Sequence, residues 1–109
     1  HPGREKRRRP LDEIAPGHPA WPAWAQAGLR AAQVAPSAVN RQPWRFALGT
    51  DGAVEVSSAG RDMPLAPARR LDCGIAMLHF ELGARGAGCA GVWEPLAGVA
   101  VARWVPTRI

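Results

Sequence analysis

The sequence predicts an α+β domain with an antiparallel sheet and two main helices. Three observations support this prediction: an alanine-rich helical segment, a later segment with apolar residues at helical spacing, and a pair of short strand-like segments after each of them. Because only a few residues join the strands of each pair, neighbouring strands should run antiparallel. The predicted order is therefore helix, hairpin, helix, hairpin.

The first helix is expected over residues 20–34. Its candidate core residues are apolar and recur along the segment: Trp21, Trp24, Leu29 and Val34. Pro22 is compatible with this helix because it falls in the first turn, and Pro36 ends it because proline lacks the amide hydrogen that a helix requires. The sequence leaves open whether Trp21 and Trp24 pack in this domain or on another lobe.

The strands are expected to be short. They are residues 45–48, 53–57, 90–94 and 99–105. Asp51-Gly52 separates the first two and is the residue pair most typical of a hairpin turn. Residues 63–67 are expected to form a loop. Trp93 and Trp104 fall within the second pair of strands and are expected in the core.

The second helix is expected over residues 69–84. It carries apolar residues at helical spacing, namely Leu71, Ile75, Leu78 and Leu82, which predict a stripe facing a core. Cys73, Met77 and Phe80 widen this stripe, which predicts burial on more than one side. Gly74 costs a helix about 1 kcal/mol relative to alanine, which suggests that a neighbouring backbone approaches closely there.

The charge is uneven along the chain of 109 residues. Of its net charge of +5, five basic groups and one acidic group lie within the first nine residues, which leaves the remainder with nine basic and eight acidic residues. We therefore expect residues 1–19, rich in Pro, Gly and charge, to form a linker with a helical turn at 11–14, and residues 20–109 to form one lobe. An interaction arm is the alternative for the basic run. Nucleic acid is an unlikely partner, because no aromatic residues interleave with the arginines.

Several functional classes are not supported by the sequence. No apolar run is long enough to span a bilayer, so we expect a cytoplasmic protein without a membrane partner. Cys73 and Cys89 stand among small or apolar residues without matching ligands, which predicts buried, reduced thiols and no metal site. His79 is expected in the core or at an interface.

Polar chemistry is concentrated in residues 35–46, APSAVNRQPWRF. Ser37, Asn40 and Gln42 fall on a proline-bounded loop between a helix and a strand, and their hydroxyl and carboxamide groups both donate and accept hydrogen bonds. Such a loop could bind the edge of a planar heterocycle. Alternatively, Ser37 and Asn40 cap and turn the chain, while Trp44 and Phe46 belong to the core.

This segment resembles the APSAxNxQPW motif of the nitroreductase family, flavoproteins that take electrons from NAD(P)H onto FMN and pass them to an acceptor. A second block, LDCGIAMLHFELGA at residues 71–84, is similar to the core helix of that family, and Gly91-Val92-Trp93 is similar to the strand after it. The similarity is greatest to the branch in which two lobes are fused in one chain. Residues 2–14 resemble its inter-lobe linker, so the chain resembles the C-terminal lobe.

The resemblance implies a nitroreductase-like lobe with a flavin site. It implies that the isoalloxazine ring of FMN is contacted by four residues: Pro36, Ser37, Asn40 and Gln42. The flavin would carry the hydride chemistry, so no catalytic side chain is expected. NAD(P)H and a small-molecule electron acceptor are the implied partners.

One family feature is missing from the sequence. The family binds the FMN phosphate through an Arg-x-Ser-x-Arg motif in its N-terminal segment, and no segment of this chain matches that motif. The resemblance therefore implies a half-site completed by an absent N-terminal lobe or by a second subunit, with a homodimer as one possibility. The alternative is a non-catalytic lobe for dimerisation that does not bind flavin by itself.

Overall fold

The computed structural model of the protein describes residues 7–37, 40–60 and 69–108. Its elements in chain order are α1 (Leu11–Ile14), η1 (His18–Ala20), α2 (Ala23–Gln33), β1 (Trp44–Leu48), β2 (Val54–Ser58), α3 (Arg69–Gly86), β3 (Ala90–Pro95) and β4 (Ala100–Arg108). No helix in the described part of the chain is long and apolar enough to cross a membrane. The loop predicted at residues 63–67 lies outside the described residues.

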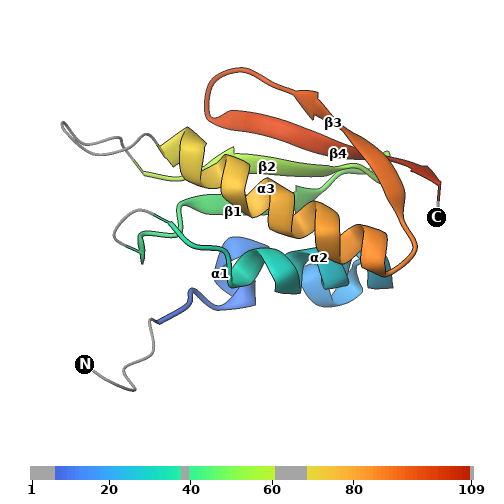
Figure 1. Ribbon diagram of the computed structural model, residues 1–109, viewed down its shortest axis with the longest axis horizontal. Helices are drawn as coiled ribbons and strands as arrows, with labels where there is room; N and C mark the ends of the chain where they lie inside the picture. The colour runs from blue at the N-terminus through green and yellow to red at the C-terminus, as the bar shows by residue number, and fades with distance from the viewer. Residues whose placement is uncertain (1–6, 38–39, 61–68, 109) are drawn as a thin grey trace.

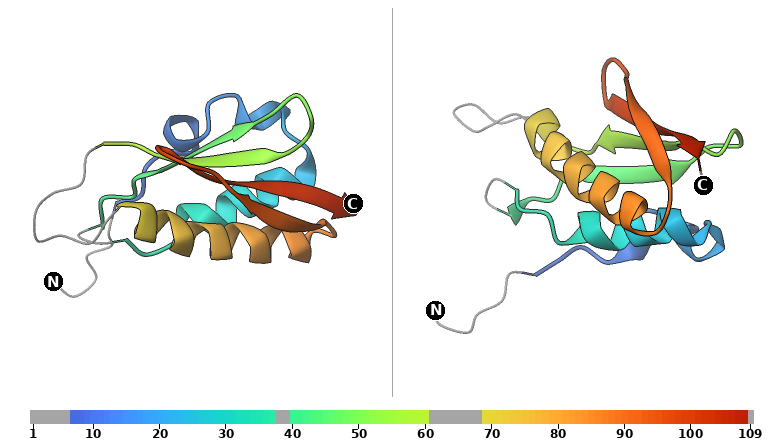
Figure 2. Two further views of the ribbon diagram at one scale, coloured as in Figure 1. Left: turned by 90° about the horizontal axis from the view of Figure 1, so that it is seen from above. Right: turned by 45° about the vertical axis from the view of Figure 1, so that its right-hand side comes forward.

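The domain has the predicted α+β architecture, with the helix, hairpin, helix, hairpin order. The four strands form one antiparallel sheet in the order β1-β2-β4-β3, so the two hairpins join along β2 and β4. Helix α3 lies across one face of the sheet, and α2 packs alongside α3 (Figures 1 and 2). The core lies between these layers.

The first hairpin forms at the predicted turn. Trp44 pairs with Ser58 and Leu48 pairs with Val54 across the two strands. The Asp51 carboxylate accepts a hydrogen bond from the Ala53 amide at 3.1 Å, and Gly52 adopts a positive φ of 87°. A side chain is disfavoured at such a φ, so Gly52 meets a requirement of this turn.

Helix α2 is shorter than expected because Pro22 stands before its first residue. Trp21 and Trp24 are both buried within this domain, which answers the question that the sequence left open. Leu29 is also in the core. Val34 was expected there too, but this prediction was wrong: it follows the last turn of the helix and is 53% exposed.

Helix α3 forms over the predicted segment, and Ile75 of the expected stripe packs against the core, but the three leucines of that stripe do not. Leu71, Leu78 and Leu82 are 63%, 56% and 62% exposed. The buried face of the helix carries instead a different set: Asp72, Cys73, Ala76, Phe80 and Ala84. Cys73 and Phe80 are buried and Met77 packs against the core, as predicted, but the leucine side of the helix is exposed, so α3 is not buried all round.

The close backbone approach expected at Gly74 occurs elsewhere. A Cβ atom at Gly74 would meet no described atom within 4 Å. At Gly83 it would lie 2.6 Å from the carbonyl oxygen of Ala27, and at Gly28 it would lie 2.8 Å from the Phe80 ring. Glycine is therefore needed where α2 and α3 meet, and Gly74 faces outward.

The core is rich in aromatic residues. Phe80 stacks on Phe46 with ring centroids 5.5 Å apart, and its ring meets Trp93 and Trp104 edge-on. Trp104 is fully buried and Trp93 packs against the core, as predicted. Cys73 and Cys89 are buried free thiols, also as predicted.

Residues 7–20 pack onto the domain. The helical turn expected at 11–14 forms as α1, and Ile14 and Ala15 are both buried in the core. The chain then passes through the short 3-10 helix η1 into α2. The segment that the sequence suggested as a linker thus contributes to the folded lobe from Arg7 onward.

Candidate functional site

The predicted flavin loop connects α2 to β1 at one end of the sheet (Figure 1). Ala35 is buried, Pro36 is exposed, and Ser37 and Asn40 are half-buried. Asn40 and Gln42 have positive φ values of 56° and 47°, and no other non-glycine residue in the described ranges has one. Such backbone is uncommon for residues with a side chain and is concentrated at functional sites.

Ser37 and Gln42 close this loop. The backbone amide of Gln42 donates a hydrogen bond to the Ser37 hydroxyl oxygen at 2.9 Å, and the backbone amide of Asn40 donates to the Ser37 carbonyl at 3.1 Å. Ser37 therefore turns the chain, which was the alternative weighed from the sequence. Its hydroxyl acts only as an acceptor in the Gln42 contact, so its own hydrogen can be donated to a ligand.

The Gln42 side chain is 4% exposed and is surrounded by hydrogen-bond partners. Its Nε2 donates to the carbonyl of Arg7 at 2.8 Å and to Oδ1 of Asn40 at 3.0 Å, while its Oε1 accepts from the Arg9 amide at 2.8 Å. The carboxamide is therefore engaged by the protein itself. Its geometric role is to join the loop to residues 7–9.

Asn40 shares this contact with the N-terminal segment. Its Nδ2 donates to the carbonyl of Arg7 at 2.8 Å, and its Oδ1 accepts from Gln42. These bonds use one of the two amide hydrogens, and the side chain is only half-buried. Asn40 can thus offer a second hydrogen to a ligand.

Arg9 also binds the loop, through its guanidinium group. Its guanidinium donates to the carbonyls of Arg41 at 2.9 Å and of Gln42 at 3.0 Å, and to the Glu13 carboxylate at 2.7 Å. Burial lowers the pKa of the neighbouring Arg45, and the charge of Arg9 lowers it further. Local spacing does not single out Arg9, because its partners in the loop, Arg41 and Gln42, lie more than thirty positions away in the chain.

A buried ion pair connects the loop to α3. Nε of Arg41 donates to Oδ2 of Asp72 at 2.8 Å, and the two side chains are 11% and 4% exposed. Arg41 and Asp72 lie 31 positions apart in the chain, so no local spacing indicates this pair. Removing either side chain would leave a buried charge without this partner, so the ion pair helps to fix how the loop lies against α3. The loop is therefore anchored both to residues 7–9 and to the first turn of α3.

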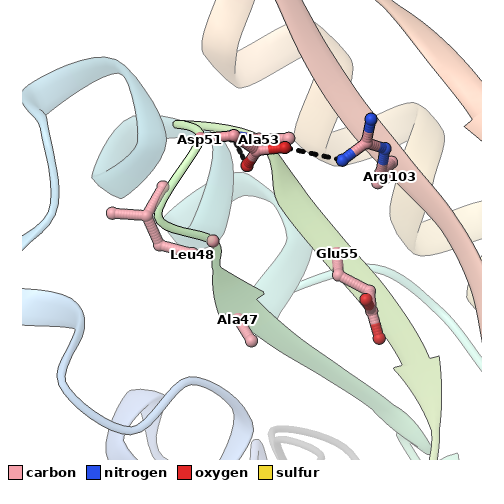
Figure 3. A pocket seen from close by; sticks show the side chains of 7 residues that line it. Ala47, Leu48, Asp51, Ala53, Glu55 and Arg103 are labelled. Carbon is pink, nitrogen blue, oxygen red and sulfur yellow. Dashed lines mark hydrogen bonds and ion pairs between the residues drawn. The ribbon is translucent and has the colours of Figure 1, made fainter.

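Two pockets on the described surface are both too small to hold a flavin. One, of about 150 Å³, lies at the far end of β1 (Figure 3), where Arg103 pairs with Asp51 at 2.7 Å. The other, of about 200 Å³, lies between Ser58 and Arg70. Ligand pockets usually measure roughly 300–1,000 Å³. A flavin would therefore need further walls.

The described residues contain no group of three or more His, Cys, Asp or Glu side chains that could hold a metal ion. His79 is half-buried on α3. In the loop, the Ser37 hydroxyl and the Asn40 side-chain amide each keep a hydrogen that can bind a ligand, and Pro36 is exposed next to Ser37 in the chain. Hydrogen-bond donors and a flat apolar surface suit the edge of a planar heterocycle.

Comparisons with known proteins identify related sequences and structures. The family model described as "Putative TM nitroreductase" matches residues 2–84. A crystal structure from Thermotoga maritima, described as a putative nitroreductase, matches with a TM-score of 0.73 and 26% sequence identity. The match covers 94% of this chain but only 43% of that protein, so the chain spans less than half of its length. No curated protein matches the chain.

Proposed function

The chain belongs to this nitroreductase family, and on that premise we propose that it forms half of an FMN-dependent NAD(P)H oxidoreductase completed by a second lobe or subunit. It would contribute to the flavin-ring site through Pro36, Ser37, Asn40 and Gln42. One observation carries the proposal: the only two non-glycine residues with positive φ among those described, Asn40 and Gln42, belong to this loop. FMN, when bound, would supply the hydride chemistry.

The four residues would not act alike. Pro36 is exposed and Ser37 is half-buried, so the Pro36 ring and the Ser37 hydroxyl would meet the flavin directly, together with the second amide hydrogen of Asn40. Gln42 is buried, so it would hold the loop in its strained conformation and orient the Ser37 hydroxyl through its backbone amide. NAD(P)H and a small-molecule acceptor would approach the flavin from the side that this lobe leaves open.

A flavin titration tests the residue assignment. FMN fluorescence is followed as the chain is added, for the wild type, Ser37→Ala and a control, Ser57→Ala in β2. Losing one neutral hydrogen bond of about 0.5–1.5 kcal/mol should weaken binding by roughly 2- to 12-fold in Ser37→Ala and leave the control unchanged. Equal affinities in all three proteins would remove Ser37 from the site, provided that circular dichroism finds each one folded.

The second candidate function is a non-catalytic lobe that serves only in assembly. The exposed leucines of α3 favour it, because they offer a surface for association without any need of flavin. A folded oligomer whose addition leaves FMN fluorescence unchanged at every concentration would support this function over the oxidoreductase.

A further inference from the structure

The described part of the basic run, residues 7–9, is docked on the candidate flavin loop. The carbonyl of Arg7 accepts hydrogen bonds from the side chains of Asn40 and Gln42, both at 2.8 Å. The backbone amide of Arg9 donates to the Gln42 carboxamide at 2.8 Å. A solvated linker would lack these contacts. The arginine side chains of this segment are therefore held at the loop, and the proposed function gives them no role.

Positive charge is in excess around the loop. Five arginines lie in the loop, in residues 7–9 or at the start of β1: Arg7, Arg8, Arg9, Arg41 and Arg45. Glu13 pairs with Arg9 at 2.7 Å and with Arg45 at 3.4 Å. Asp72 pairs with Arg41 at 2.8 Å. Five positive charges against these two negative ones leave an excess of three, which favours the approach of an anion.

Arg8 supplies part of this excess from a fixed position. Its Nη1 donates to the carbonyl of Ala35 at 2.8 Å, and the residue is half-buried. In the part of the chain that the structure describes, no carboxylate pairs with Arg8. The bond to Ala35 leaves the hydrogens of Nε and Nη2 available for a ligand. Because the guanidinium is already held, a ligand would not have to order a free side chain.

The free side of this guanidinium suits a phosphate group. Nε and Nη2 present two parallel N–H groups, which can bind two oxygens of one phosphate. Ala35 directly precedes Pro36 and Ser37, the residues proposed to meet the flavin ring, so Arg8 lies beside the ring contacts. The neighbouring Arg7 is exposed, and no carboxylate among the described residues pairs with it either.

We propose that Arg8, assisted by Arg7, binds a phosphate oxyanion of the substrate that meets the flavin. The proposed function supplies such a group, because the two halves of NAD(P)H are joined by a pyrophosphate; FMN also carries a phosphate. The inference deepens the proposed function by giving its nucleotide a binding residue. It rests on that function only for the flavin nearby, since the position and charge of Arg8 do not depend on flavin.

Inorganic pyrophosphate is the probe for the first experiment. It is added to the isotope-labelled chain and followed by heteronuclear NMR at low ionic strength, where surface charges are least screened. We expect saturable shifts of the Arg8 Nε–H signal and of the Ser37 backbone amide. The signals of Arg30, an exposed arginine on α2, should shift little. No saturable shift at Arg8 would overturn the proposal.

Three variants separate a specific site from general charge attraction. Arg8→Gln should raise the dissociation constant for pyrophosphate about tenfold or more, because it removes a charged donor pair. Arg30→Gln, the matched control, lowers the net charge equally and should change the constant less than about twofold. Arg8→Lys keeps the charge without the paired donors and should lie between them. Equal losses in Arg8→Gln and Arg30→Gln would overturn the proposal, once circular dichroism shows that each variant is folded.

The source of the oxyanion is tested with whole ligands. Dissociation constants of NADPH, FMN and riboflavin are measured by fluorescence for the wild type and for Arg8→Gln. Weaker binding of NADPH, with an unchanged ratio between FMN and riboflavin, supports the nucleotide as the source. Weaker binding of FMN without any change for riboflavin would overturn that assignment in favour of the flavin phosphate.

The two proposals fail separately. A chain that binds pyrophosphate through Arg8 but binds neither FMN nor riboflavin supports the oxyanion site and contradicts the flavin site. A chain that binds riboflavin while pyrophosphate shifts no signal of Arg8 supports the flavin site and overturns the oxyanion site.

Discussion

The two sides of α3 differ in both residue size and surroundings. The inner side carries small residues around one large aromatic ring, Phe80, and is fully buried. The outer side carries three exposed leucines. Small residues at Gly28 and Gly83 let the backbones of α2 and α3 approach closely, which larger side chains would prevent. The most apolar stripe of a helix is therefore not always the side that packs in the core of its domain.

Unfolding measurements on single variants test this difference between the two sides of α3.

The largest expected effect is at Phe80. Phe80→Ala removes a fully buried ring that contacts Phe46, Trp93 and Trp104, and should lower the free energy of unfolding by about 3–5 kcal/mol in urea denaturation. The matched variant on the outer side, Leu82→Ala, should change it by less than about 0.5 kcal/mol. Similar losses in both variants would contradict the assignment of the two sides.

Gly83→Ala should be the next most damaging change. The added methyl group would lie 2.6 Å from the backbone carbonyl oxygen of Ala27, so α2 and α3 must separate. Overpacking of this kind typically costs about 1–3 kcal/mol, which thermal or urea denaturation would detect. A variant as stable as the parent would mean that the two helices do not meet closely at Gly83.

The contact between the loop and residues 7–9 should depend on Gln42. Gln42→Ala leaves the Arg9 amide without its side-chain partner and removes one of the two side-chain donors to the Arg7 carbonyl, at a cost of about 1–2 kcal/mol. Trypsin should then cleave after Arg7 and Arg8 faster than in the parent. Gln26→Ala, which removes a more exposed glutamine on α2, is the control, and equal cleavage rates in the two variants would count against the anchoring role.

Gly74→Ala should raise the free energy of unfolding slightly, whereas Gly83→Ala lowers it. The methyl group meets nothing within 4 Å, and alanine is the better helix former. The free energy of unfolding should rise by about 0.5–1 kcal/mol in the same denaturation experiment. A loss of stability would show that the outer side of α3 is covered within a single copy.

The smallest effect at neutral pH concerns Cys73. Burial raises the pKa of its thiol from 9.0 to about 11, so the folded state holds this proton more tightly than the unfolded state. That contribution to stability is fully present below pH 9 and is lost as the pH rises through 11. The chain has no tyrosine and a single lysine, so few other groups titrate in this range. Cys73→Ala should flatten the decline between these pH values, and an unchanged decline would contradict this origin.

Most of the fold could be predicted from local pattern. The Asp51-Gly52 turn and the proline at position 36 place element ends within a few residues, because their chemistry acts on the adjoining backbone. Which side of α3 is buried could not be predicted in this way. Its two sides are both apolar, and only the tertiary position of α2 decides which one is buried.

The candidate site was predictable in part. The resemblance points to the loop, and its hydroxyl and amide groups could be listed from the sequence. The contacts of Arg9 with Gln42 and of Arg41 with Asp72 join residues more than thirty positions apart, and no local spacing encodes them. The positive φ values of Asn40 and Gln42 could not be predicted from the sequence either, since neither residue type requires that backbone.

The central claim is that this lobe serves the flavin ring and not its phosphate. Comparing the dissociation constants of FMN and riboflavin for the purified chain, by fluorescence titration, tests it most directly, because the two ligands share the ring and differ in the phosphate. We expect the affinities of FMN and riboflavin to lie within about threefold of each other, since the sequence offers no match to the family's phosphate-binding motif. FMN binding about 100-fold tighter than riboflavin would contradict it, because this chain would then hold the phosphate as well.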